Sequence, residues 1–440
     1  ISISIRIYVT IRRQIIDTLT EEEKKMRRKI MYDEQDARID YGIILPVLLL
    51  ALISIATLLS TTYLQVANGS LRTVFMQFVW YVFGTIAIVI IMQFDSEQLW
   101  KLTNLSYIIG LLLLVAVLFF YDRGTAAATG AKSWFRIASF SFQPSEIVKI
   151  FYILMLAKVA THHNMLTKYR TRSTDWYLFA KLIAYALPAL LLVILQNDLG
   201  TTLVFLMILG GVMIMSGISW KILLPLILTA VLIGSLLIYL VVYNRQLLLN
   251  IGFKNYQFGR IDSWLDPYRD QGGAGFQLFQ SLKAIGSGKM FGKGYGHSEV
   301  YVPVRESDLI FATIGENFGF LGGTFLITVY FILIYQMIRV CFDTKNEFYS
   351  YIATGVIMMI LFHVVENIGM TIGLLPLTGI PLPFISQGGS SLLGNMMGIG
   401  LMMSMRYHFK SNIFGEDEDP FNQQTRQQQQ LPEEFLKARA

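Results

Sequence analysis

The stretch LIFATIGENFGFLGGTFLITVYFILIYQMIRV, residues 309–340, sets the class of fold. An α-helix needs about 20 mostly apolar residues to cross the hydrocarbon core of a bilayer, and this run exceeds that length. It therefore predicts a membrane-spanning helix. The acidic Glu316 lies inside it, and because a charge in a span is costly, we expect this side chain to face a cavity or the protein interior.

The rest of the chain repeats this pattern. Of its 440 residues 54% are hydrophobic and 15% charged, with a mean hydropathy of +0.52, whereas soluble domains carry about 25% charged residues. We predict an all-α polytopic membrane protein with about ten transmembrane helices in one domain, residues 41–410. A single Cys341 excludes an intramolecular disulfide framework. The other nine expected helices span residues 41–61, 71–94, 102–121, 145–161, 176–196, 199–216, 220–243, 351–375 and 389–406.

Basic residues predict the orientation, because short cytoplasmic loops are enriched in Lys and Arg. The arm 1–40 contains EEEKKMRRK, and the loops that ten spans would place inside hold Lys101, Lys168, Lys221, Lys345 and Lys410. Both termini are thus expected in the cytoplasm, and the Gln-rich tail 411–440 is expected to be disordered. The long segment 244–308, between the seventh and eighth spans, is expected outside.

Two exterior loops keep basic residues against this trend, which favours an anionic ligand such as a phosphorylated lipid; contact with anionic head groups is the alternative. One loop holds Lys132 and Arg136. In the segment 244–308, the basic residues Arg245, Lys254, Arg260, Arg269, Lys283, Lys289, Lys293 and Arg305 outnumber the acids, which include Asp262, Asp266, Asp270 and Glu299.

Few ionisable residues interrupt the other spans. Glu146 and Lys149 are three apart, so they share a helix face and can pair. Lys158 is expected to extend its amine to the membrane surface. For Asp198, His363 and Glu366, a role in a wet cavity and a role in fixing helix packing both remain open.

Glycine and proline predict irregular backbone in two places. In LLPLTGIPLPFISQGGSS, residues 374–391, non-helical backbone at membrane depth must be covered by protein or line a cavity. Its Gly-Gly-Ser-Ser turn either presents free N–H groups to a phosphate or is a plain Ser cap. The exterior stretch GAGFQLFQSLKAIGSGKMFGKGYGH, residues 273–297, lacks the preceding strand of a nucleotide loop; FQLFQSLKAI instead predicts a helix on the outer membrane surface.

Six ordered stretches together resemble the SEDS family (shape, elongation, division and sporulation), more its elongation branch, RodA, than its division branch, FtsW. They are GAKSWFRIASFSFQPSEIVK (130–149), QNDLGTT (196–202), GRIDSWLDP (259–267), GFQLFQSLKAIGSGKMFGKGYG (275–296), VYVPVRESDLIFATIGENFGFLGG (300–323) and TGIPLPFISQGGSS (378–391).

The resemblance implies a peptidoglycan glycosyltransferase of the bacterial cytoplasmic membrane that polymerises lipid II at the outer face during cell elongation, with inversion. It maps the essential acidic residue onto Asp308, as general base or metal-associated carboxylate. Its matched stretches give the candidate substrate-binding residues Lys132, Arg136, Glu146, Lys149, Asp198, Arg305, Gln387, Ser390 and Ser391. Two alternatives are a lipid II flippase or transporter, and a non-catalytic scaffold of the elongation machinery.

The resemblance also implies lipid II as substrate, a class B penicillin-binding protein and other elongation-complex membrane proteins as partners, and a divalent cation, Mg²⁺ or Mn²⁺, as the one candidate cofactor; no nucleic acid is expected.

The chain departs from the family at three positions. Ser133 stands before the Trp where many relatives carry a basic residue. Asn197 stands where many carry Pro, and Glu306 where many carry His. These departures weaken single substrate contacts but not Asp308.

Overall fold

A computed structural model describes residues 39–64, 71–137, 140–167, 169–251, 255–268, 273–344 and 346–409. The tail and, apart from Ile39 and Asp40, the predicted arm lie outside them. Residues Tyr41–Met405 form one compact unit, to which the following description refers. Its long helices are α3 (Tyr41–Leu64), α4 (Leu71–Met92), α5 (Ser96–Phe120), α7 (Pro144–Leu166), α8 (Arg172–Leu195), α9 (Leu199–Met215), α10 (Trp220–Tyr243), α14 (Ile310–Asp343), α15 (Glu347–Thr371) and α16 (Gly389–Phe409).

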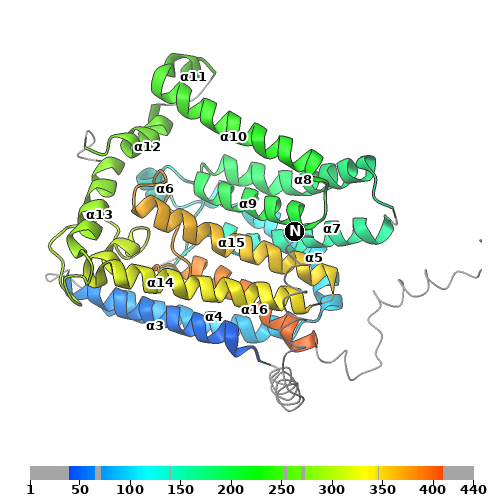
Figure 1. The fold of residues 1–440 in the computed structure, drawn as a ribbon, viewed down its shortest axis with the longest axis horizontal. Helices are drawn as coiled ribbons and strands as arrows, with labels where there is room; N and C mark the ends of the chain where they lie inside the picture. Colours follow the sequence, from blue (N-terminus) through cyan, green and yellow to red (C-terminus); the bar gives the residue numbers. More distant parts are fainter. Residues whose placement is uncertain are drawn as a thin grey trace, which may run out of the picture. The chain divides into compact units, whose positions relative to one another are not determined.

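These helices lie side by side along one direction (Figure 1). Among the described residues, seven are long and apolar enough to cross a membrane: α3, α4, α5, α8, α10, α14 and α15. The shorter α9 is also apolar. This confirms the all-α polytopic fold, whereas the number of ten spans stays a prediction because α7 and α16 carry more polar residues.

The predicted boundaries lie within six residues of the observed ones, and two of the differences have identified local causes. Helix α5 begins at Ser96 instead of 102, because Asp95 accepts a hydrogen bond from the Gln98 amide at 2.8 Å and closes a capping box. Helix α15 spans Glu347–Thr371 instead of 351–375. It ends early because Gly373 adopts a left-handed φ of 78°, a common helix-ending conformation.

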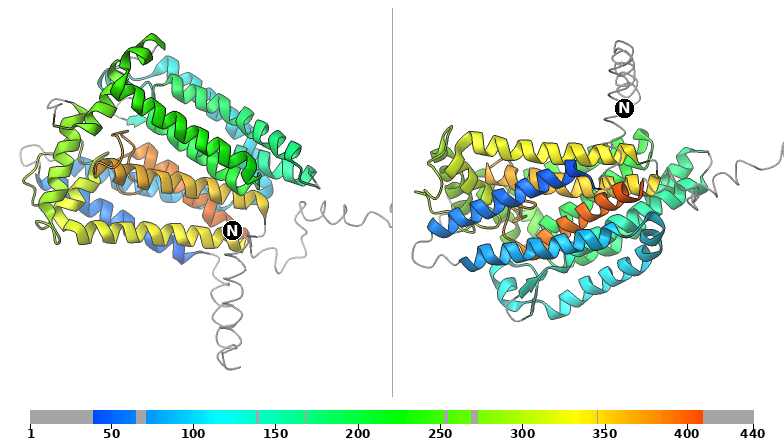
Figure 2. Two further views of the ribbon diagram at one scale, coloured as in Figure 1. Left: turned by 45° about the horizontal axis from the view of Figure 1, so that its top comes forward. Right: turned by 90° about the horizontal axis from the view of Figure 1, so that it is seen from below.

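The predicted exterior segment is largely helical. It contains α11 (Arg245–Ile251), α12 (Asn255–Leu265) and α13 (Ala274–Gly288), and α13 confirms the helix expected for FQLFQSLKAI. Figures 1 and 2 show α12 and α13 crossing one end of the bundle, where α14 begins. Two short elements, α6 (Arg123–Thr129) and the antiparallel hairpin of β1 (Phe135–Ile137) and β2 (Phe140–Phe142), connect α5 to α7.

The glycine-rich stretch after α13 pairs with a break in α14. Gly319 has φ 64° and ψ −158°, which interrupts the helix. The freed backbone finds partners in the stretch 289–294: the Phe320 amide donates to the Lys289 carbonyl at 2.9 Å, and the Lys293 amide donates to the Glu316 carbonyl at 2.9 Å. The glycines therefore serve close backbone contact between two segments, which accounts for their spacing without any nucleotide.

This pairing predicts the effect of a methyl group at Gly319. A Cβ there would lie 2.4 Å from the Gly292 amide nitrogen, on a φ that L-residues rarely adopt. We expect Gly319→Ala to lower stability by roughly 1–3 kcal/mol, the range for a strained backbone position, measured by thermal unfolding in detergent. Gly210→Ala, where a Cβ meets nothing within 4 Å, is the matched control; equal stability of both variants would contradict the pairing.

The predicted irregular segment after α15 is held by side chains of other helices. Tyr81 of α4 and Tyr330 of α14 donate hydrogen bonds to the carbonyls of Phe384 and Pro383. Ser54 of α3 donates to the Ile385 carbonyl at 2.7 Å. Because buried carbonyls need donors, these three helices enable a non-helical backbone to persist inside the bundle. We call residues 372–388 the re-entrant segment.

Candidate active site

Asp308 lies two residues before α14, at the end that α12 and α13 cross. It is half-buried, and its carbonyl accepts a hydrogen bond from Asn367 of α15 at 2.7 Å. Its carboxylate faces the re-entrant segment, since a Cβ on Gly379 would lie 3.4 Å from Oδ2. Burial raises the pKa of Asp308 to about 6, although a hydrogen bond with Ser307 and the charge of Arg260 act in the opposite direction.

The re-entrant segment fixes the backbone around Asp308. The Ser386 hydroxyl donates to the Ser307 carbonyl at 2.5 Å, and the Gln387 amide donates to the Glu306 carbonyl at 2.9 Å. Asn367 donates to the Ile380 carbonyl at 2.8 Å as well as to Asp308. The main chain of Gln387, a predicted site residue, is thus hydrogen-bonded two residues before Asp308. These bonds tie residues 306–308 to the re-entrant segment.

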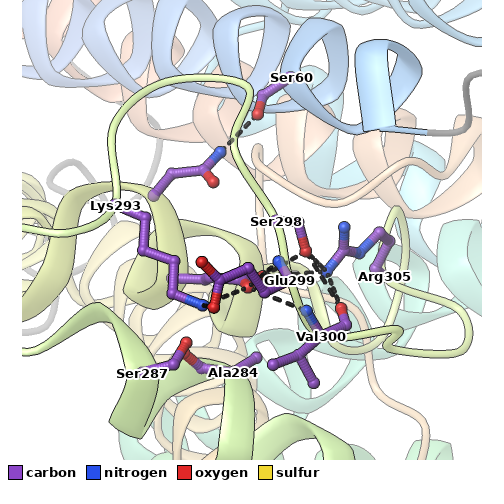
Figure 3. Close-up of polar contacts among 10 residues, drawn as sticks. Ser60, Ala284, Ser287, Lys293, Ser298, Glu299, Val300 and Arg305 are labelled. Carbon is purple, nitrogen blue, oxygen red and sulfur yellow. Dashed lines mark hydrogen bonds and ion pairs between the residues drawn. The ribbon is translucent and has the colours of Figure 1, made fainter.

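Arg305 and Glu316 form the centre of a second polar cluster, which we call the loop clasp. Glu316 is fully buried, and Arg305 Nη2 lies 3.2 Å from its Oε2. The Ser298 hydroxyl donates to Oε2 at 2.6 Å and the Glu299 amide donates to Oε1 at 2.9 Å, while Lys293 Nζ lies 3.4 Å from Oε1. Figure 3 shows Lys293, Ser298 and Arg305 close together, with dashed lines for the hydrogen bonds and ion pairs among the residues drawn.

The loop clasp confirms Glu316 as an interior packing residue. A carboxylate that accepts several hydrogen bonds can be buried without losing its charge. Here it joins the glycine-rich stretch, residues 298–300 and α14. Arg305 is directed at Glu316 in this structure, so its expected contact with a phosphate stays a prediction.

A third group of polar residues joins α7, α9 and α16. The Gln143 side-chain amide donates to Asp198 Oδ2 at 2.8 Å, and the Gln143 main-chain amide donates to the Ser390 hydroxyl at 3.0 Å. Asp198 also caps α9 by accepting from the Thr201 amide at 3.0 Å. Two predicted site residues, Asp198 and Ser390, are therefore brought together through Gln143, which the sequence interpretation did not single out. The hydroxyl of Ser391, another predicted site residue, accepts a hydrogen bond from the Asn395 side-chain amide at 3.5 Å.

Glu146 and Lys149 pair as predicted, deep in the bundle. Lys149 Nζ lies 2.8 Å from Glu146 Oε2 and 3.0 Å from His363 Nε2, and all three side chains are buried. His363 Nδ1 lies 2.6 Å from the Met359 carbonyl, so Nε2 is the acceptor available to Lys149. This group links α7 to α15, and Gly394 of α16 packs on the Glu146 carbonyl.

Lys132 and Arg136 lie on the exposed connection between α6 and α7. Arg136 Nη1 is 3.8 Å from Asp122 Oδ2, and Lys132 Nζ lies 5.2 Å from the centre of the Tyr121 ring. The Lys132 amide donates to the Gln196 carbonyl at 2.8 Å, next to Asp198. The backbone therefore holds this loop against the α8–α9 turn, while both charged ends remain exposed.

No described residues gather into a group of three or more His, Cys, Asp or Glu side chains. Mg²⁺ commonly binds through one or two carboxylates, water and substrate phosphates. The described residues near Asp308 fit only that kind of site, in which a phosphate-bearing substrate completes the ligands.

The sequence of this chain is similar to those of known proteins. The family model described as cell cycle protein, FtsW/RodA/SpoVE, matches residues 39–411. The stage V sporulation protein E of Bacillus subtilis is 33% identical over 328 residues, 73% of this chain and 83% of that protein. The peptidoglycan glycosyltransferase MrdB of Escherichia coli K12 is 33% identical over 334 residues, 74% of this chain and 84% of that protein.

Solved structures give the same result for the fold. A chain from a study of polymerization and crosslinking by a peptidoglycan synthase complex matches with a TM-score of 0.68 and 25% identity over 84% of this chain and 98% of that chain. The crystal structure of the rod shape determining protein RodA of Thermus thermophilus matches with a TM-score of 0.60 and 23% identity, over 84% and 97% of the two chains. The chain belongs to the FtsW/RodA/SpoVE family, which confirms the SEDS resemblance.

Proposed function

We propose that this chain is a peptidoglycan glycosyltransferase that polymerises lipid II at the outer face of the bacterial cytoplasmic membrane during cell elongation, with both termini inside. Two findings support the activity: relatives with that name cover most of the chain, and a half-buried carboxylate, Asp308, lies between α14, α15 and the re-entrant segment. The second finding carries the assignment of the site.

The chemistry requires a group of this kind. The acceptor hydroxyl must lose a proton as it attacks the sugar carbon, and a carboxylate within hydrogen-bond reach can take that proton as general base. The lipid-linked pyrophosphate of the donor is the leaving group. An inverting displacement therefore needs one base for the acceptor and a cation near this pyrophosphate. A displacement with one carboxylate as base fits inversion better than the closely paired carboxylates of retaining enzymes do.

The partner follows from the matched complex. Because a similar chain belongs to a complex in which polymerization and crosslinking are coordinated, we propose a class B penicillin-binding protein as the crosslinking partner, along with further membrane proteins of the elongation machinery. The alternative to the base role is a metal-associated carboxylate: Asp308 would then hold a divalent ion, Mg²⁺ or Mn²⁺, together with substrate phosphates, and the ion would neutralise charge on the leaving pyrophosphate.

Transport of lipid II is the main alternative, since buried charges in a helix bundle also suit a transporter. Vesicles that contain the purified protein and fluorescent lipid II separate the two. If the protein is a polymerase, the wild type forms glycan polymer, which is detected on gels. The Asp308→Asn variant, which cannot polymerise, then leaves the fraction of lipid II that an impermeant quencher can reach unchanged. Rapid transbilayer exchange without polymer, from wild type and variant alike, would favour the transporter; neither reaction, even with the partner present, would favour a scaffold.

The pKa of Asp308 predicts how activity depends on pH. A general base acts in its ionised form, so the raised pKa of about 6 makes activity fall as pH decreases through 6. We expect the kcat/KM of polymerisation to drop about tenfold per pH unit below that value and to be level up to pH 8. The measurement is the initial rate at low substrate concentration from pH 5 to 8; a rate level down to pH 5 would contradict this role for Asp308.

A further inference from the structure

Arg260 of α12 is a cation beside Asp308 that the sequence pattern did not separate from the other exterior basic residues. Its Nη1 lies 3.5 Å from the carbonyl of Thr378 in the re-entrant segment. A Cβ atom added to the next residue, Gly379, would lie 3.4 Å from Asp308 Oδ2. One peptide unit therefore separates the contact with the guanidinium from the contact with the carboxylate.

Helices α12 and α13 hold this arrangement at two further points. Trp264 Nε1 donates to the Gly373 carbonyl at 2.9 Å, and the Ser281 hydroxyl donates to the Thr371 carbonyl at 2.8 Å. With Arg260, these bonds fix the exterior helices along the start of the re-entrant segment. The helix that carries Arg260 is thus held against this segment by more than the contact of Arg260 itself.

The local charge requires such a cation. Besides Asp308, a second carboxyl group lies near Thr378: that of Glu366 of α15, which is buried. A diphosphate that arrives there would add further negative charge next to two carboxyl groups. Other candidate cations are engaged elsewhere: Arg305 pairs with Glu316 at 3.2 Å and Lys149 with Glu146 at 2.8 Å. Arg260 donates to the neutral carbonyl of Thr378, and a guanidinium has five N–H donors.

We propose that Arg260 is a further substrate-binding residue, which contacts the diphosphate of the lipid-linked donor and stabilises the charge that develops as it leaves. A planar guanidinium suits this task because it donates two parallel hydrogen bonds to phosphate oxygens. This inference rests on the proposed polymerase function. It extends the site from α14 and the re-entrant segment to the exterior helix α12.

The test uses the purified full-length protein with its crosslinking partner, and the rate of glycan polymer formation from lipid II as a function of lipid II concentration. Arg260→Gln keeps a polar side chain but removes the charge, whereas Arg260→Lys keeps the charge. We expect kcat to fall about 10- to 100-fold in Arg260→Gln, as for loss of a transition-state contact, and to stay within about tenfold of wild type in Arg260→Lys. Lys283→Gln, an exposed cation of α13, is the control with unchanged kcat.

Two results would overturn the proposal: a kcat in Arg260→Gln equal to wild type, or equal losses in the Gln and Lys variants accompanied by equal drops in melting temperature, which would show a purely structural role. If the Gln variant does not fold, the Lys variant decides alone, because loss as severe as in Asp308→Asn contradicts a role based on charge. Loss in Asp308→Asn with full activity in Arg260→Gln would refute only this inference. Full activity in Asp308→Asn would refute the proposed function of the site itself.

Discussion

Asp308→Asn is expected to reduce the kcat of lipid II polymerisation by a factor of about 10² to 10⁴, the range that general-base catalysis contributes. Asparagine has nearly the same shape and can still pack against Gly379 and the re-entrant segment, but it cannot accept the proton of the acceptor hydroxyl. Binding of lipid II should change little, so the loss should be in kcat and not in KM. Steady-state kinetics in detergent measure both constants.

The neighbouring carboxylate provides the control. Glu306→Gln removes a charge two residues away, while its main-chain bond with the Gln387 amide, 2.9 Å long, is kept. We expect this variant to retain activity within a few-fold. Equal losses at both positions would show that the general charge of the loop matters and would contradict a specific role for Asp308.

Glu316→Ala is expected to have the largest effect on stability. The carboxylate is fully buried, and its removal leaves Arg305, also buried, without its partner at 3.2 Å. Loss of one member of a buried ion pair costs about 3–5 kcal/mol, because the remaining charge stays desolvated. Thermal unfolding in detergent should show a clear drop in melting temperature, and the exterior segment should become sensitive to protease.

Glu299→Ala tests whether burial is the cause. Glu299 contacts the same Lys293, at 2.8 Å, but its side chain is 80% exposed. An exposed pair contributes little, since water already solvates both charges. We expect the melting temperature of this variant to stay close to that of wild type; a drop as large as that of Glu316→Ala would mean that the loop clasp depends on Lys293 and not on the buried carboxylate.

Much of the fold could be predicted because a bilayer restricts the alternatives. Apolar length alone marks α10 at residues 220–243, the same bounds that the structure gives. The break at Gly319 could not be predicted, because a glycine within an apolar run reads as an ordinary helical residue until its backbone partner, the stretch 289–294, is known. The contacts that decide it join segments about 25 residues apart, and periodicity describes only one segment.

The site shows the same division. The pairing of Glu146 and Lys149 followed from helical spacing, and the interior position of Glu316 followed from the cost of a charge in hydrocarbon. The position of Arg260 did not, since eight basic residues of one exterior segment look alike in sequence. Its contact with Thr378 spans 118 residues, and only the folded chain distinguishes it from Lys283.

The central claim is that this chain forms glycosidic bonds with Asp308 as the base. The most direct measurement gives purified wild type and Asp308→Asn the same labelled lipid II in detergent, with the crosslinking partner present, and resolves the products on a gel. We predict a ladder of glycan polymer from wild type and unreacted lipid II from the variant. Polymer of equal length and amount from both proteins would contradict this account.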